Sequence, residues 1–122
     1  SEDGVDIIQN YGEDLCIVCH GAIASELLAI SELLLKLDIK CKLITVWKKS
    51  ALNKINSHLS KKNIFIEEHF KGGLFEGFHL YPNSEIICIN PDTLDKYFHR
   101  RQLLIKNGIS KNNILKIFEA FK

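Results

Sequence analysis

The chain has 122 residues, of which 46% are hydrophobic and 25% are charged, and its formal net charge is +1. This balance is typical of a soluble globular protein, and the length fits one domain over residues 1–122. The near-neutral charge argues against binding to nucleic acid or to a membrane surface. Charged residues interrupt the longest apolar stretch, 22–37, which excludes it as a membrane span.

The N-terminal sequence is acidic and has no apolar signal core, so no secretory signal is predicted and a cytoplasmic location is expected. The chain contains no Met. We interpret this as a processed chain or an excised fragment of a larger protein, and we favour the fragment.

The first part of the chain predicts a strand followed by a long helix. Residues 1–13 are polar with a small apolar patch and predict an irregular or briefly extended lead-in. The apolar run 15–19 predicts a buried strand. Residues 22–37 predict the longest helix, because apolar side chains recur at spacings of three and four: Ile23, Leu27, Ile30, Leu34 and Leu37. Further leucines on its other sides predict a second packing partner.

The middle of the chain predicts a second strand and a second helix. The strand covers 39–46, and its start is expected to be half exposed, because Lys40 and Lys42 alternate with apolar residues. Trp47 opens the loop that follows. The helix covers about 50–60, with Leu52, Ile55 and Leu59 on its inner face.

The C-terminal half predicts two further strands, each followed by helix. Residues 64–67 are expected to form the central strand, and 85–89 form the other. Helices are predicted over 73–80 and 93–105. Ser110 is a good N-cap for a last helix, whose apolar stripe contains Ile114, Ile117, Phe118 and Phe121.

Strands that are continuously apolar and alternate with helices indicate a parallel sheet covered on both faces. With right-handed crossovers, this order predicts an α/β fold. We expect a three-layer Rossmann-like sandwich with a mostly parallel sheet of four to five strands.

Four cysteines, Cys16, Cys19, Cys41 and Cys88, lie in predicted strands. We interpret them as reduced core residues. Residues 16–20 match the covalent haem pattern Cys-x-x-Cys-His. However, side chains three positions apart on a strand point to opposite faces, so these two thiols are not expected to hold one haem, one metal or one redox pair.

Two further groups are candidate sites. His20 and Gly21 follow the first strand, where the N-terminus of the long helix could attract an anion. A plain turn is the simpler interpretation, because the three glycines of a dinucleotide site are absent. Glu67, Glu68 and His69 lie at the end of the strand predicted over 64–67, where they could form an acid–base or metal cluster. A structural or interface role for these three residues is favoured.

The segment EEHFKGGL at 67–74 resembles the glutamate-glutamate-histidine and double-glycine signature of the transketolase C-terminal domain family. In this signature, Gly72 and Gly73 follow Glu67, Glu68 and His69. The resemblance extends along most of the chain. It includes the acidic residue, apolar strand and glycine at 14–21, the helix rich in Ala and Leu, and the glycine, apolar and serine pattern at 108–110.

The resemblance implies a domain that is not itself catalytic and binds no cofactor. Thiamine diphosphate and a divalent metal are then held by the pyrimidine- and pyrophosphate-binding domains or subunits of the parent enzyme. The domain supports a homodimer and the docking of those partners, and a regulatory ligand site is possible in such domains. The isolated chain is expected to be inactive, with an exposed apolar patch on the long helix or on 74–80.

The parent enzyme could be a two-subunit transketolase, a deoxyxylulose-phosphate synthase relative or an oxo-acid dehydrogenase β-type subunit; His69 favours the transketolase type. Two other classes stay open. One is an independent Rossmann-like module that binds a small anionic ligand. The other is an autonomous enzyme that uses His69 with Glu67 or Glu68.

Overall fold

The computed structural model describes residues 4–20, 23–47, 49–68, 75, 82–89 and 109–121. The elements in chain order are β1 (Val5–Asn10), β2 (Leu15–His20), α1 (Ala24–Leu35), β3 (Cys41–Val46), η2 (Lys49–His58), β4 (Asn63–Glu68), β5 (Ser84–Ile89) and α3 (Lys111–Ala120). Within these residues, no helix has the length and apolar character needed to cross a membrane. The predicted helices over 73–80 and 93–105 lie outside the described residues, apart from Phe75.

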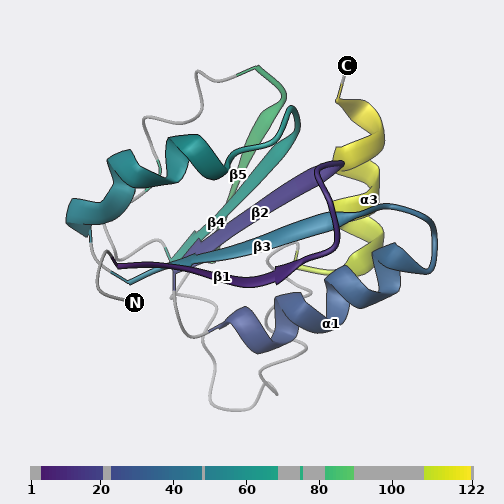
Figure 1. The fold of residues 1–122 in the computed structure, drawn as a ribbon. Coiled ribbons are helices and arrows are strands. Elements are labelled where there is room, and N and C mark those ends of the chain that lie inside the picture. The colour runs from purple at the N-terminus through teal and green to yellow at the C-terminus, as the bar shows by residue number, and fades with distance from the viewer. Residues whose placement is uncertain are drawn as a thin grey trace, which may run out of the picture.

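The strands form one five-stranded sheet in the order β1-β3-β2-β4-β5 (Figure 1). The four strands from β2 to β5 pair in parallel, which confirms the mostly parallel α/β sheet. Two expectations were wrong in detail. The middle strand of this order is β2. Residues 64–67 belong to β4, which lies between β2 and β5. Residues 5–10 form a full edge strand, which pairs antiparallel with β3.

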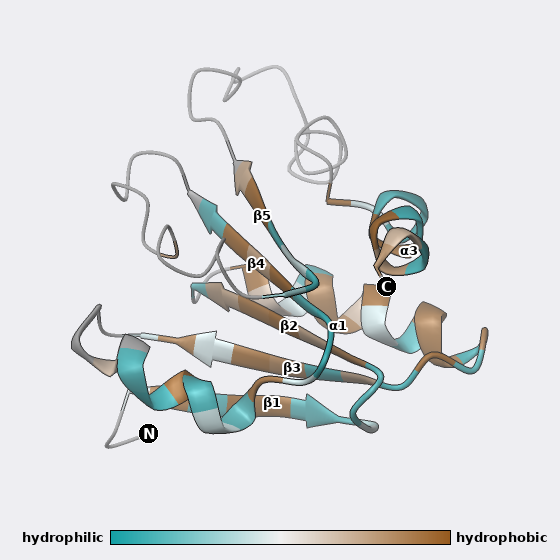
Figure 2. Ribbon diagram, turned by 90° about the horizontal axis from the view of Figure 1, so that it is seen from above, coloured by the Kyte–Doolittle hydropathy of each residue, from teal (hydrophilic) through white to brown (hydrophobic). Residues whose placement is uncertain are grey.

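Each face of the sheet carries its own hydrophobic cluster, and helices cover both faces. On one face, α1 and α3 pack against side chains such as Leu15, Ile17 and Cys19. On the other face, Ala51 and Ile55 of η2 pack against the strand side chains that alternate with those of the first cluster. Figure 2 shows the central strands in the hydrophobic colour and η2 largely in the hydrophilic one. The predicted three layers are confirmed.

The long helix buries the stripe that its spacing predicts. Leu27 and Leu34 are fully buried, and Ile30 is 8% exposed. Leu37 was expected on this stripe but is 49% exposed, because α1 ends at Leu35. Asp38 then adopts a positive φ of 63°, and the chain turns away toward β3.

The last helix is capped at its N-terminus by Ser110, as predicted. Its Oγ accepts a hydrogen bond from the backbone amide of Asn113 at 3.1 Å, which satisfies one of the free N–H groups of the first turn. Ile114 is fully buried. The ammonium of Lys62 lies 4.4 Å from the centre of the Phe118 ring, so a cation–π contact also joins α3 to the start of β4.

The segment 49–58 is a 3-10 helix and not the expected α-helix. Ser and Asn side chains favour local bonds to the backbone over the regular α-helical pattern. Ser57 illustrates this, since its Oγ donates to the carbonyl of Lys54, three residues earlier. The predicted apolar contact is kept, because Ile55 is fully buried against the sheet.

Candidate functional site

The parallel strands end along one edge of the sheet, where open α/β sheets commonly bind ligands or neighbours. Pairing in the sheet brings three chemically active side chains to this carboxyl edge. Glu67 is paired with Cys88 on β5. On the other side of β4, Cys19 is paired with Ile66, immediately before His20 and Glu67. His20, Glu67 and Cys88 therefore lie on three neighbouring strands.

Glu67 is the most constrained of these residues. It is only 4% exposed, and both carboxylate oxygens have a partner. Oε2 accepts a hydrogen bond from the backbone amide of Phe75 at 2.7 Å. Oε1 accepts one from the thiol of Cys88, with a sulfur–oxygen distance of 3.4 Å. This carboxylate thus acts as an anchor between β4, β5 and the chain at Phe75.

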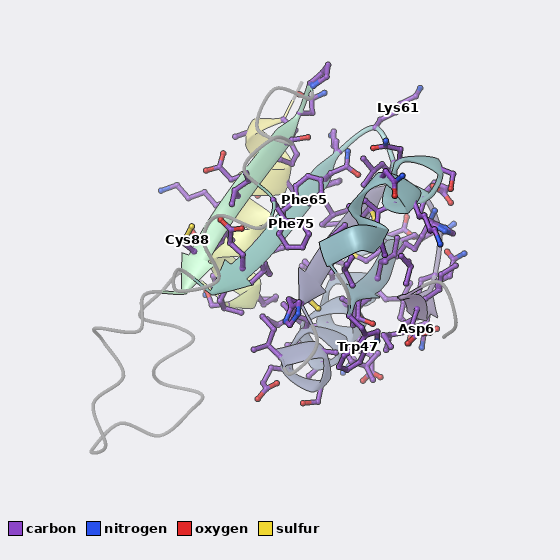
Figure 3. The ribbon with its side chains drawn as sticks, turned by 90° about the vertical axis from the view of Figure 1, so that its left-hand side faces the viewer. Asp6, Trp47, Lys61, Phe65, Phe75 and Cys88 are labelled. Carbon is purple, nitrogen blue, oxygen red and sulfur yellow. The ribbon has the colours of Figure 1, made fainter. Side chains whose placement is uncertain are left out.

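An aromatic pair packs beside this anchor. Phe75 and Phe65 are both fully buried, and their ring centres are 5.4 Å apart with a tilt of 42°. Figure 3 labels the two rings, which lie next to one another. Tilted pairs at this distance are favourable, so the side chain and the backbone of Phe75 are held by two independent contacts.

Cys88 was expected in the core but is exposed. It lies on β5, the strand that ends the sheet on that side, whereas Ile87 on the same strand is 7% exposed. Desolvation raises the pKa of the thiol, and the hydrogen bond to Glu67 and its negative charge raise it further. The thiol therefore stays protonated and serves as a hydrogen-bond donor.

The structure describes only some of the other site residues that the sequence predicted. His20 ends β2, is half-buried and pairs with Val46 of β3. Glu68 ends β4. The remaining candidates lie outside the described residues: Gly21, His69, Gly72 and Gly73. Among the residues that the structure does describe, no group of three or more His, Cys, Asp or Glu side chains could hold a metal ion.

The two cysteines of the haem-like motif lie on opposite faces of the sheet, as predicted. Cys16 belongs to the cluster under η2, and Cys19 belongs to the cluster under α1 and α3. Burial raises the pKa of each thiol to about 12. Neither a shared metal nor a redox pair is compatible with this arrangement.

Trp47 is a feature of the carboxyl edge that the sequence did not reveal. It follows β3 and is 50% exposed. Its indole N–H donates to Oδ2 of Asp6 at 2.7 Å, and its backbone amide donates to the carbonyl of Gly4 at 2.8 Å. Figure 3 shows Trp47 and Asp6 at this corner of the molecule. Both bonds fasten the start of β1 to the end of β3.

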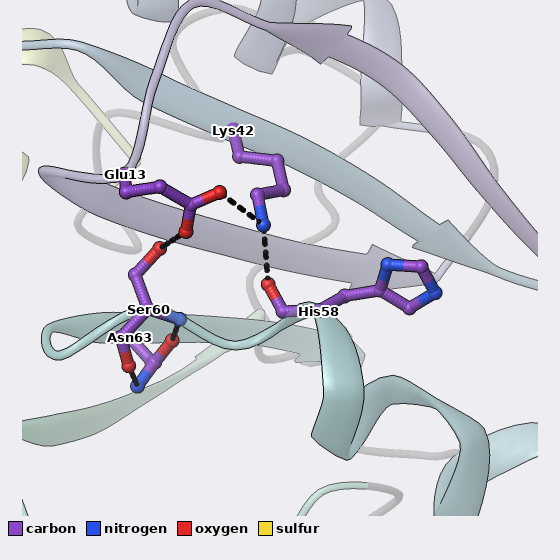
Figure 4. A network of polar contacts seen from close by, with 5 residues as sticks. All are labelled: Glu13, Lys42, His58, Ser60 and Asn63. Carbon is purple, nitrogen blue, oxygen red and sulfur yellow. Dashed lines mark hydrogen bonds and ion pairs between the residues drawn. The ribbon is translucent and has the colours of Figure 1, made fainter.

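The opposite, amino edge is closed by a polar network (Figure 4). The buried ammonium of Lys42 contacts Oε1 of Glu13 at 2.8 Å and donates to the carbonyl of His58 at 2.8 Å. The hydroxyl of Ser60 donates to Oε2 of Glu13, and the side chain of Asn63 bonds the backbone of Ser60 twice. The bonds from Lys42 and Ser60 to Glu13, and from Lys42 to the carbonyl of His58, join distant chain segments. We therefore assign this network to stability.

The start of β3 was expected to be half exposed, and for Lys42 this expectation was wrong. The residue is 6% exposed, because its ammonium reaches the acceptors just described while its stem lies against the sheet. Only Lys40 of the two alternating lysines faces solvent.

The fold resembles that of transketolases. A split-gene transketolase, described as an inactive β4 tetramer, matches with a TM-score of 0.65 and 18% identity over 98% of this chain and 42% of that chain. A transketolase from Campylobacter jejuni matches with a TM-score of 0.66 and 12% identity over 97% of this chain and 18% of that chain. No protein-family model and no curated protein matches the sequence.

The chain therefore spans 42% and 18% of the lengths of these two transketolases. At such identities the likeness concerns the arrangement of helices and strands. The described fold is a transketolase-like α/β domain with a buried glutamate anchor at the carboxyl edge of its sheet.

Proposed function

We propose that this chain is the non-catalytic C-terminal domain of a transketolase-like, thiamine-diphosphate-dependent enzyme. The observation that carries the proposal is the transketolase-like fold over 98% of the chain, together with the sequence signature at 67–74. The domain would support a homodimer and the docking of the cofactor-binding domains. A regulatory ligand site on it is part of the same proposal.

The environment of Glu67 supports a structural role for the signature. A general base needs an oxygen that is free to reach a substrate proton. Glu67 is instead only 4% exposed, and its two oxygens accept hydrogen bonds from the amide of Phe75 and from the thiol of Cys88. We therefore interpret the first glutamate of the signature as an internal anchor, and this interpretation favours a supporting domain over an autonomous enzyme that uses this residue.

The end of α1 supports the docking role. Leu33 in its last turn is 43% exposed, and Leu37 just beyond the helix is 49% exposed. The C-terminal end of α1 therefore exposes two large apolar side chains, one in the helix and one in the turn that follows it. Such side chains are natural contacts for another domain, as was expected for the long helix.

In this proposal, thiamine diphosphate and its divalent metal belong to the pyrimidine- and pyrophosphate-binding domains or subunits of a cytoplasmic enzyme. The isolated chain would be inactive.

The docking role is tested by sedimentation velocity with the thiamine-diphosphate-binding domains of the proposed parent enzyme, produced as a separate polypeptide. The double variant Leu33→Ser, Leu37→Ser should weaken the complex at least tenfold. The matched control is Ile7→Ser, Ile8→Ser on β1, where the two side chains are 49% and 40% exposed, and this control should bind normally. Complex formation that is equal for the wild type and both variants would overturn docking through the end of α1. No complex with the wild type would overturn the proposed function itself.

A further inference from the structure

We draw no further inference here: the strongest candidate, the exposed apolar edge formed by Ile7 and Ile8 of β1 and by Trp47 after β3, carries none because nothing in the structure shows what covers it.

Discussion

The carboxylate of Glu67 accepts a hydrogen bond from the backbone amide of Phe75 at 2.7 Å. The bond joins two residues that are eight positions apart in the chain, one at the end of β4 and the other in the Phe65–Phe75 aromatic pair. Both groups are buried, so neither can exchange its partner for water without exposing the core. The first residue of the signature thus determines where Phe75 lies.

Replacing Glu67 by Ala should lower the free energy of unfolding by about 1–3 kcal/mol, because it leaves a buried amide without an acceptor. Glu67→Gln should cost less, since its amide oxygen can still accept from Phe75. Urea unfolding followed by circular dichroism measures both. Cys88→Ala serves as the matched control, because it removes the other partner of Glu67 and leaves the bond to Phe75 intact. Equal stability of wild type and Glu67→Ala would contradict the anchor.

The thiols should differ sharply in their reactivity toward a disulfide reagent at pH 8. Burial raises the pKa of Cys16, Cys19 and Cys41 to about 12, and these side chains are covered. Cys88 is exposed and should be the first to react in the native protein, whereas all four should react in urea.

Glu67 should control the rate at Cys88. Its hydrogen bond and charge raise the pKa of that thiol, so Glu67→Gln should increase the thiolate fraction and the labelling rate. A Cys88→Ser variant identifies the reacting thiol. A labelling rate that is the same or slower in Glu67→Gln would show that the carboxylate does not act on Cys88.

The network at the amino edge should make stability depend on pH. Hydrogen bonds from Lys42 and Ser60 hold the pKa of Glu13 below its usual value of 4.5. A group whose pKa is lowered by folding stabilises the protein above its unfolded-state pKa, and this stabilisation is lost as pH falls through the folded-state pKa. Wild type should therefore be more stable than Glu13→Gln at pH 7, and the difference should vanish in acid.

The exposure of the Glu13–Lys42 ion pair limits the difference in the free energy of unfolding between wild type and Glu13→Gln. The Glu13 side chain is 64% exposed and that of Lys42 is 8% exposed, so solvent screens the interaction from one side and we expect about 1 kcal/mol. Unfolding of both proteins between pH 3 and pH 7 provides the measurement. The same comparison in a Lys42→Met background should show a much smaller pH dependence. A difference that is constant across this range would exclude the assigned role of Glu13.

Gly12 should not tolerate a side chain. Its φ is +155°, and a Cβ at this position would lie 2.7 Å from the Cβ of Lys40. Gly12→Ala should lower the free energy of unfolding by more than about 1 kcal/mol, since both the backbone angle and the contact oppose it. The cost should be smaller in a Lys40→Gly background, where the contact is absent. Thermal unfolding of the wild type, the two single variants and the double variant gives the coupling free energy between the two positions. A coupling free energy of zero would refute the contact.

The sequence predicted those features that depend on local patterns. The apolar spacing of α1, the buried run of β2 and the N-cap at Ser110 each involve residues close together in the chain. The placement of Cys16 and Cys19 on opposite faces follows from the two-residue period of a strand. These predictions needed no knowledge of how distant segments pair.

The features that the sequence did not reveal depend on long-range pairing. β1 is a strand because its backbone pairs with β3, about 40 residues later. Cys88 is exposed although it belongs to an apolar run, because such a run does not reveal which of its side chains the rest of the fold will cover. The partners of Glu67 come from Phe75 and from β5, so its sequence motif indicated a site but not the role of the carboxylate.

The most direct test of the central claim is reconstitution of activity. The chain is mixed with a separately produced polypeptide that carries the thiamine-diphosphate-binding domains of the proposed parent enzyme. Transketolase activity is then measured with thiamine diphosphate and a divalent metal, alongside molar mass by light scattering. We predict no activity from either polypeptide alone, and a complex with transketolase activity when both are present. Full activity of the partner without this chain, with the chain remaining a separate monomer, would contradict the account.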